Sequence, residues 1–152
     1  MELIEKLCRA HGVSGFEDEV REIMLKELKK CSDSIEIDNL GNVIAKKGSS
    51  GKKIMIAAHM DEIGLMVKHI DKDGYLSFVK IGGIDNRILP HQRVIIKNKD
   101  RFVNGVVGFK PPHLLKEEDK KKIVEHSEMF IDIGAKNKKE AEKIVKVGNT
   151  VS

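Results

Sequence analysis

Aromatic residues are scarce in this chain of 152 residues, which has no tryptophan, one tyrosine and five phenylalanines. A core must therefore be built from Ile, Val, Leu and Met, and the hydrophobic content of 40% suits one globular domain or two small ones. The net charge of +4 could indicate a nucleic-acid partner, but the lysines are interleaved with acidic residues and no aromatic stacking platform accompanies them. We expect a solvated surface and no nucleic-acid partner.

Cysteines and long apolar runs are also few. Cys8 and Cys31 provide neither a disulfide framework nor metal-ligand spacing, and both lie on the apolar faces of expected helices. We therefore predict reduced, buried thiols, as is usual in the cytoplasm. No apolar run approaches the about 20 residues of a membrane-spanning helix, and the amino terminus lacks the pattern of a secretion signal. The sequence thus predicts a cytoplasmic protein with no membrane partner.

An apolar run at residues 54–58 ends abruptly in a histidine and two carboxylates. Its lack of alternation predicts a central strand buried on both faces, and ligands of open α/β sheets bind at the carboxyl ends of such strands. His59 is therefore a candidate metal ligand. Asp61 can accept from the other ring N–H, which fixes the tautomer and orientation of the imidazole. On its own the His-x-Asp motif is weak, because Asp61 also suits a turn or a cap.

Periodicity predicts the other elements. Apolar residues at helical spacing indicate a short helix through residues 3–8 and a second one that Ser14 caps with Glu17 as its capping-box partner. Alternation and turn residues indicate a hairpin through residues 35–45. Beyond Gly64, short strands are expected at residues 65–70, 75–80, 94–97, 101–107 and 129–133, and then a helix capped by Asn137 and Glu140. The fold class is therefore α/β, with a small barrel or sandwich in its second part.

Five further histidines lack the spacing of a self-contained metal site: His11, His69, His91, His113 and His126. We expect a buried or capping role for His11 at a helix terminus and solvent-facing or structural roles for the others. His91 and His113 lie in predicted loops and stay open as binding candidates. The charged run at residues 116–122 is interpreted as a solvated loop or helix start.

A longer string around His59, AAHMDEIGLMV at residues 57–67, resembles the first metal motif of the M42 metallo-aminopeptidases. This group contains tetrahedral and glutamyl aminopeptidases and some proteins formerly labelled endoglucanases. Four other stretches follow the family's order: VSGFE at 13–17 with Val20 and Arg21, DNLGNV at 38–43, GVVG with KPPH within 105–113, and IDIGA at 131–135. The resemblance covers essentially the whole chain.

The resemblance implies a partial zinc-peptidase-like α/β catalytic domain at residues 1–67. An inserted β-rich, PDZ-like or barrel dimerisation domain would follow at residues 68–147, and residues 148–152 would begin the return to the catalytic domain. It implies an aminopeptidase that hydrolyses amino-terminal residues from peptides with two divalent metal ions, zinc or cobalt. His59 would be a metal ligand, Asp61 would be the catalytic residue that orients it, and the chain would form a homo-oligomer through residues 68–147.

The rest of the family's metal site is expected beyond the insert: a bridging aspartate, a glutamate base beside a glutamate ligand, a further acidic ligand and a second histidine. None can be assigned here, and one histidine cannot hold two metal ions. Asn149 stands where the family commonly has aspartate, which affects only a local turn or hydrogen bond. We therefore expect the amino-terminal portion of an enzyme, inactive alone, whether it is a truncated chain, a truncated gene product or a part completed by another chain.

Two alternatives stay open. The chain could be a non-catalytic assembly module that dimerises through its β-rich part. It could also be an endoglucanase-type hydrolase, but the carboxylates of Asp61 and Glu62 are adjacent on an extended segment and point to opposite faces, whereas glycosidases need a pair that flanks the sugar bond. The preferred amino-terminal residue, the native metal and the number of subunits do not follow from the sequence.

Overall fold

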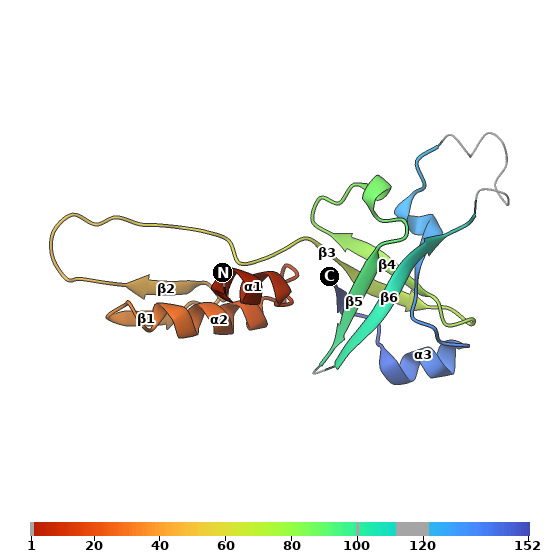
Figure 1. The fold of residues 1–152 in the computed structure, drawn as a ribbon, viewed down its shortest axis with the longest axis horizontal. Helices are drawn as coiled ribbons and strands as arrows, with labels where there is room; N and C mark the ends of the chain where they lie inside the picture. The colour runs from red at the N-terminus through yellow and green to blue at the C-terminus, as the bar shows by residue number, and fades with distance from the viewer. Residues whose placement is uncertain (1, 100, 112–121) are drawn as a thin grey trace. The chain divides into compact units, whose positions relative to one another are not determined.

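The computed structural model describes residues 2–99, 101–111 and 122–152. They form two compact units, an amino-terminal unit at Met1–Glu62 and a barrel unit at Ile63–Ser152. Two helices, a hairpin and a long extended segment make up the first unit, and a closed barrel with a covering helix makes up the second (Figure 1). The chain is thus an α/β protein that contains sheets, as expected.

Both predicted helices of the amino-terminal unit form. Helix α1 spans Glu2–Arg9 and helix α2 spans Asp18–Leu28. The predicted cap of α2 is wrong, because the residue that precedes the helix is Glu17 and its side chain makes no capping hydrogen bond. The hydroxyl of Ser14 bonds elsewhere, to Asp61, so it is not available to a helix that begins at Asp18.

The predicted hairpin is also present. Strands β1, Ser34–Ile37, and β2, Val43–Lys46, pair antiparallel with Ile37 opposite Val43. In the turn, the Asp38 carboxylate accepts hydrogen bonds from the backbone N–H groups of Leu40 and Asn42, each at 2.9 Å, and from the Asn42 side chain at 2.8 Å. Hydrogen bonds from the side chain and then the backbone of Asn42 hold the pKa of the Asp38 carboxyl below its usual value.

The buried strand expected at residues 54–58 is not formed in this structure, so that prediction is wrong here. The segment is an extended coil in which the side chains of Ile54, Met55 and Ile56 are 87%, 89% and 93% exposed. A strand buried on both faces needs paired neighbours and cover above and below. Among the described residues, backbone pairing reaches this coil only at Glu62, where Val13 forms an isolated parallel bridge.

The barrel unit contains every strand expected after Gly64 and one more. The described strands close in the order β3-β4-β7-β6-β5-β8, and all pairs are antiparallel. Their bounds are β3 Gly64–Ile70, β4 Leu76–Ile81, β5 Arg93–Asn98, β6 Arg101–Phe109, β7 Met129–Asp132 and β8 Thr150–Val151. Strand β8 closes the barrel by placing Val151 opposite both Leu65 of β3 and Ile96 of β5.

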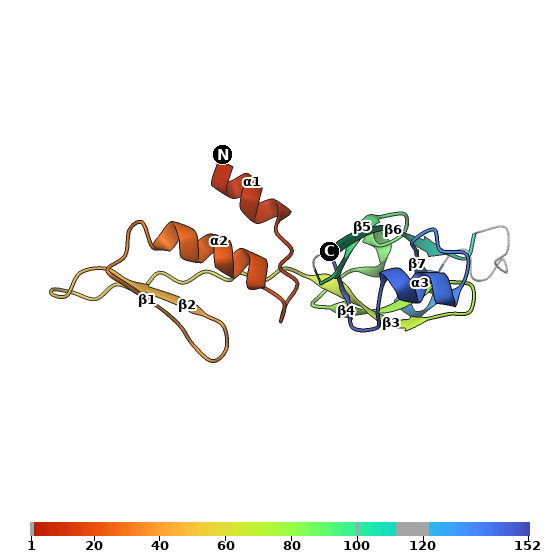
Figure 2. The ribbon, with the colours of Figure 1, turned by 90° about the horizontal axis from the view of Figure 1, so that it is seen from below.

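The barrel core is aliphatic, as the scarcity of aromatic residues predicts. Its fully buried side chains come from all around the barrel: Val67, Leu76, Ile96, Val107, Ile131, Val145 and Val151. Each contributes roughly 1.5–3 kcal/mol by leaving water. Helix α3, Lys138–Ile144, lies beside the barrel (Figure 2) and adds Ala141 to this core. The predicted cap of α3 is confirmed, because Asn137 Oδ1 accepts from the Glu140 N–H at 3.1 Å.

The compact units divide at different residues from those expected. Boundaries at 67/68 and 147/148 fall within the barrel unit, because residues 64–67 pair as part of β3 and residues 150–151 pair as β8. Residues 148–152 therefore belong to the barrel unit in this structure. The catalytic and dimerisation roles expected for the two parts stay predictions.

The two thiols are free and exposed. Their expected burial is wrong, because α1 has no buried residue and Cys31 lies beyond the end of α2. Within the described ranges, no helix is long and apolar enough to cross a membrane.

Candidate metal centre

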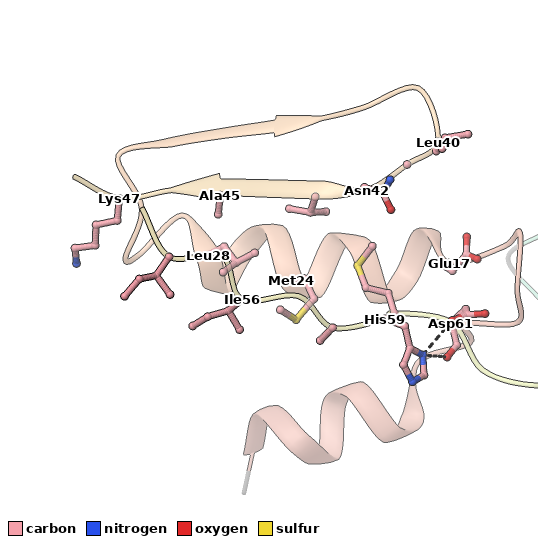
Figure 3. A pocket seen from close by; sticks show the side chains of 15 residues that line it. Glu17, Met24, Leu28, Leu40, Asn42, Ala45, Lys47, Ile56, His59 and Asp61 are labelled. Carbon is pink, nitrogen blue, oxygen red and sulfur yellow. Dashed lines mark hydrogen bonds and ion pairs between the residues drawn. The ribbon is translucent and has the colours of Figure 1, made fainter. Parts of the chain in front are cut away.

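His59 and Asp61 contact each other as the His-x-Asp spacing predicts. The ring Nδ1 of His59 lies 3.0 Å from Asp61 Oδ1 and 2.9 Å from the Asp61 backbone oxygen (Figure 3). Both partners are acceptors, so Nδ1 carries the proton and donates it. The other ring nitrogen, Nε2, then keeps a lone pair that can bind a metal ion.

Asp61 accepts hydrogen bonds on both carboxylate oxygens. While Oδ1 faces His59, Oδ2 accepts the Ser14 hydroxyl at 2.5 Å. The Ser14 hydroxyl is the largest cause of a lowered pKa for the Asp61 carboxyl, and the His59 ring adds to it. Asp61 therefore stays ionised at neutral pH and can accept from both neighbours at once.

A backbone contact brings these residues together. The Glu62 N–H donates to the Gly12 oxygen at 2.7 Å, and the Ser14 N–H donates to the Glu62 oxygen at 3.2 Å. Gly12 suits this close approach, because a Cβ there would lie 2.8 Å from Val20 Cγ2 and 3.3 Å from the Met60 oxygen. The loop before α2 is thus held against the segment that carries Asp61.

An open groove of about 690 Å³ lies within the amino-terminal unit beside this pair. Apolar side chains of α2, β2 and the extended coil line most of it, and Figure 3 shows His59 and Asp61 at one end. Glu17 also lines the groove, but its Oε1 accepts the Gly15 N–H at 2.5 Å. The groove therefore combines an apolar wall with a polar end that presents one imidazole.

The other histidines occupy separate positions. His11 is buried, as expected, and its backbone N–H donates to Glu19 Oε2 at 3.0 Å. In the barrel unit, His69 is exposed, and the His91 ring packs on Phe109 with centroids 5.3 Å apart. His126 is half-buried in a short 3-10 helix, His126–Glu128. His113 and most of the charged run at 116–122 lie outside the described residues.

A metal centre needs several ligand side chains close together, so the described residues can be checked for such a group. No group of three His, Cys, Asp or Glu side chains within residues 2–99, 101–111 and 122–152 could hold a metal ion. His59 offers an oriented ligand nitrogen, because its Nδ1 is held by Asp61, and imidazole suits zinc. The described residues therefore fit one ligand of a metal site and do not complete a centre for two ions.

Ser14 is the residue of this site that sequence reasoning missed. Its position before a helical pattern suggested a cap, and nothing local to residues 13–17 indicates a partner 47 residues away. The available signal was its place in one of the five ordered motifs of the family resemblance.

Comparison with known proteins agrees with the motifs. Residues 41–152 match the family model described as M42 glutamyl aminopeptidase. The chain is 44% identical over 154 aligned residues to the Escherichia coli protein FrvX, which is named as an aminopeptidase provisionally. This match covers 100% of this chain and 43% of FrvX. It is 43% identical to the lysyl aminopeptidase of Pyrococcus furiosus over 94% of this chain and 42% of that enzyme.

Solved structures show the same relationship. A TET aminopeptidase from a marine sediment archaeon of the Thaumarchaeota superposes with a TM-score of 0.94 at 42% identity, over 99% of this chain and 43% of that one. The TET1 peptidase of Pyrococcus horikoshii, described as able to assemble into a tetrahedron or a large octahedral shell, has a TM-score of 0.87 at 38% identity. That match covers 99% of this chain and 45% of the TET1 chain. A Thermotoga maritima structure named an endoglucanase has a TM-score of 0.79 at 39% identity, over 96% of this chain and 42% of that one.

The chain thus spans less than half the length of each of these proteins. The matched stretch includes strand β2, the His59 motif and the whole barrel unit. A family model that covers residues 41–152 of this chain identifies it as a member of the M42 glutamyl aminopeptidase family.

Proposed function

We propose that this chain supplies part of the metal centre of an aminopeptidase that removes amino-terminal residues from peptides. The observation that carries the proposal is the contact of His59 Nδ1 with Asp61, which leaves Nε2 free to bind a metal ion. Membership of the family and the enzyme names of similar proteins support the reaction class.

A pair of divalent ions would polarise the substrate carbonyl and lower the pKa of a bound water. His59 would hold one ion through Nε2, and Asp61 would hold the ring in the required tautomer and orientation. Zinc or cobalt would suit this ligand. We propose that the other ligands and the general base come from outside these 152 residues, since the similar enzymes are more than twice as long.

The proposal includes a homo-oligomer built through residues 68–147, the expected PDZ-like insert. Strands β5 and β6 expose Ile95, Phe102 and Val106 at 43%, 57% and 44%. A hollow of about 560 Å³ on the same strands is also lined by Arg93 and Asp132. Exposed apolar side chains bordered by charge are typical of interfaces. The assembly described for the similar TET1 peptidase supports the same proposal.

Location in the cytoplasm is a further part of the proposal. Its support is the pair of free thiols, Cys8 and Cys31, which suit a reducing compartment. Labelling of both thiols by a thiol-specific reagent in intact cells would test it.

A chimera tests the catalytic role. This chain replaces the matching part of the Pyrococcus furiosus lysyl aminopeptidase, and hydrolysis of a lysyl anilide is measured with zinc or cobalt. We expect His59→Ala to abolish hydrolysis and to lower the bound metal content. His69→Ala, which changes an exposed histidine of the barrel unit, is the matched control and should change neither. Full activity and metal content in the His59 variant would overturn the proposal.

The endoglucanase alternative has weaker support, although two similar structures carry that word in their names. A glycosidase needs one carboxylic acid with a raised pKa opposite a second carboxylate. Here the pKa of Asp61 is lowered, and the Glu62 carboxylate accepts the Gly12 N–H at 3.2 Å. The two side chains therefore bond to different groups and do not form such a pair.

A further inference from the structure

The proposed reaction assigns no role to the Ser14 hydroxyl, which contacts Asp61 beside His59. We propose that Ser14 is a positioning residue: its hydrogen bond to Asp61 fixes the carboxylate that holds His59 in the Nδ1–H tautomer with Nε2 presented. The use of Nε2 for a metal rests on the proposed function, whereas the positioning itself concerns only residues of this chain.

The His59 ring depends on hydrogen bonds for its orientation. Its side chain is 84% exposed, so packing restrains it little. Its Nδ1 faces two acceptors of the same residue, Asp61 Oδ1 and the Asp61 backbone oxygen. The backbone oxygen is held by the chain, but the carboxylate is 42% exposed, and the torsion that turns it has a broad minimum. A second contact is needed to keep Oδ1 directed at the ring.

Ser14 provides that contact. Its single hydroxyl proton has two acceptors in reach, Asp61 Oδ2 at 2.5 Å and the Glu62 backbone oxygen at 3.5 Å. The shorter bond goes to a charged oxygen, and hydrogen bonds to ionised acceptors are the stronger ones. The proton therefore goes to Asp61. With Oδ2 held in this way, Oδ1 is left for His59.

The Ser14 hydroxyl can act as a fixed point because its backbone is anchored independently of its side chain. The Ser14 N–H donates to the Glu62 oxygen, and the adjacent Val13 forms the parallel bridge with Glu62 and is fully buried. Removing the hydroxyl leaves these contacts in place. The change therefore isolates the link from Ser14 to His59 through Asp61.

The test measures the tautomer of His59 in the 152-residue chain without metal, from the ¹⁵N shifts of its two ring nitrogens at a pH where the ring is neutral. Wild type should hold the proton on Nδ1, whereas free imidazole side chains in water favour Nε2. Ser14→Ala should lower the ratio of the Nδ1–H to the Nε2–H form by roughly twofold to twelvefold, the range that one net hydrogen bond corresponds to. Ser14→Thr should restore the ratio, since threonine places a hydroxyl at the same position.

The matched control is Ser32→Ala. The Ser32 hydroxyl also makes a side-chain hydrogen bond in the amino-terminal unit, to the Leu28 oxygen at 2.7 Å, but it has no contact with His59 or Asp61. This variant should keep the wild-type ratio. The backbone amide signals of Val13 and Glu62 show in each variant whether the parallel bridge is intact.

A second measurement needs no variant. Exchange of the Ser14 hydroxyl proton for deuterium should shift the ¹³C signal of the Asp61 carboxyl in wild type, because the two are hydrogen-bonded. An unchanged tautomer ratio in Ser14→Ala, or the absence of that isotope shift, would overturn the inference. Neither readout involves metal or turnover, so failure here is distinct from failure of the chimera, which would overturn the proposed function instead.

Discussion

The hydroxyl of Ser14 donates a 2.5 Å hydrogen bond to the carboxylate of Asp61 across 47 residues of sequence. The other oxygen of that carboxylate faces His59 Nδ1 at 3.0 Å, so three side chains are joined in series. Because His59 is largely exposed, substitutions along this series should change its hydrogen bonding without opening a hydrophobic core.

Asp61→Asn should weaken metal binding by the chimera roughly ten- to a hundredfold, because the amide is a poorer acceptor for the His59 ring N–H. Competition with a chelator of known zinc affinity measures the change. Glu62→Gln alters the neighbouring carboxylate, which contacts Gly12 and not His59, and should bind metal nearly as wild type does. Equal zinc affinities in wild type and Asp61→Asn would contradict the role given to Asp61.

The 152-residue chain alone should show no aminopeptidase turnover with zinc or cobalt added. Its described residues supply one oriented ligand and no group of three that could hold an ion, whereas the proposed reaction needs two ions. Release of nitroaniline from a panel of aminoacyl nitroanilides is the assay, and the Pyrococcus furiosus enzyme is the positive control. Hydrolysis that co-purifies with this chain and is lost in His59→Ala would show that its ligand set has been underestimated.

Ile96→Ala should destabilise the barrel unit by about 2–5 kcal/mol, because Ile96 is fully buried and the substitution leaves a cavity in the core. Ile95→Ala is the matched control, since this neighbour on β5 has a side chain that is 43% exposed, and its effect should be much smaller. Urea unfolding followed by the signals of barrel residues gives both values. Similar losses in the two variants would contradict the inward direction of Ile96.

The carboxyl of Asp85 should contribute to stability above its unfolded pKa, near 3.8, and lose that contribution as the pH falls towards 2. Hydrogen bonds from the Arg87 side chain and then its backbone N–H lower the pKa of Asp85 to about 2, so the folded chain binds this proton less readily than the unfolded chain does. The stability difference between wild type and Asp85→Asn should therefore be constant above pH 5 and shrink between pH 4 and 2. Denaturant unfolding across that range measures it, and a difference that grows on acidification would show the opposite sign.

The chain should associate through the outer face of β5 and β6. Phe102→Lys places a charge among the exposed apolar side chains of that face and should weaken association. Leu40→Lys changes an 88% exposed apolar residue of the amino-terminal unit and serves as the control. Sedimentation equilibrium over a wide concentration range gives the masses, and a single species at 17.1 kDa for the wild type throughout would rule the association out.

Elements that depend on residues close in sequence were predictable. The apolar spacing of α1 and α2, the alternation of β1 and β2, and the capping of α3 by Asn137 are all local patterns, and each element forms where its pattern lies. The contact of His59 with Asp61 belongs to the same class, since two residues of chain already bring the ring and the carboxylate within reach.

Features that depend on distant segments were decided by the tertiary structure. The two residues of β8 are too few to show alternation, and they form a strand because β3 and β5 lie on either side. Residues 54–58 are apolar enough for a buried strand, but burial requires paired and covering segments from elsewhere in space, and the described structure shows no backbone pairing of Ile56 and leaves it 93% exposed. Ser14 has the local pattern of a cap, yet its hydroxyl bonds to Asp61, because the bridge between Val13 and Glu62 brings that carboxylate within reach. A sequence pattern thus determines what a residue can bond to or bury, and the folded chain determines which partner is within reach.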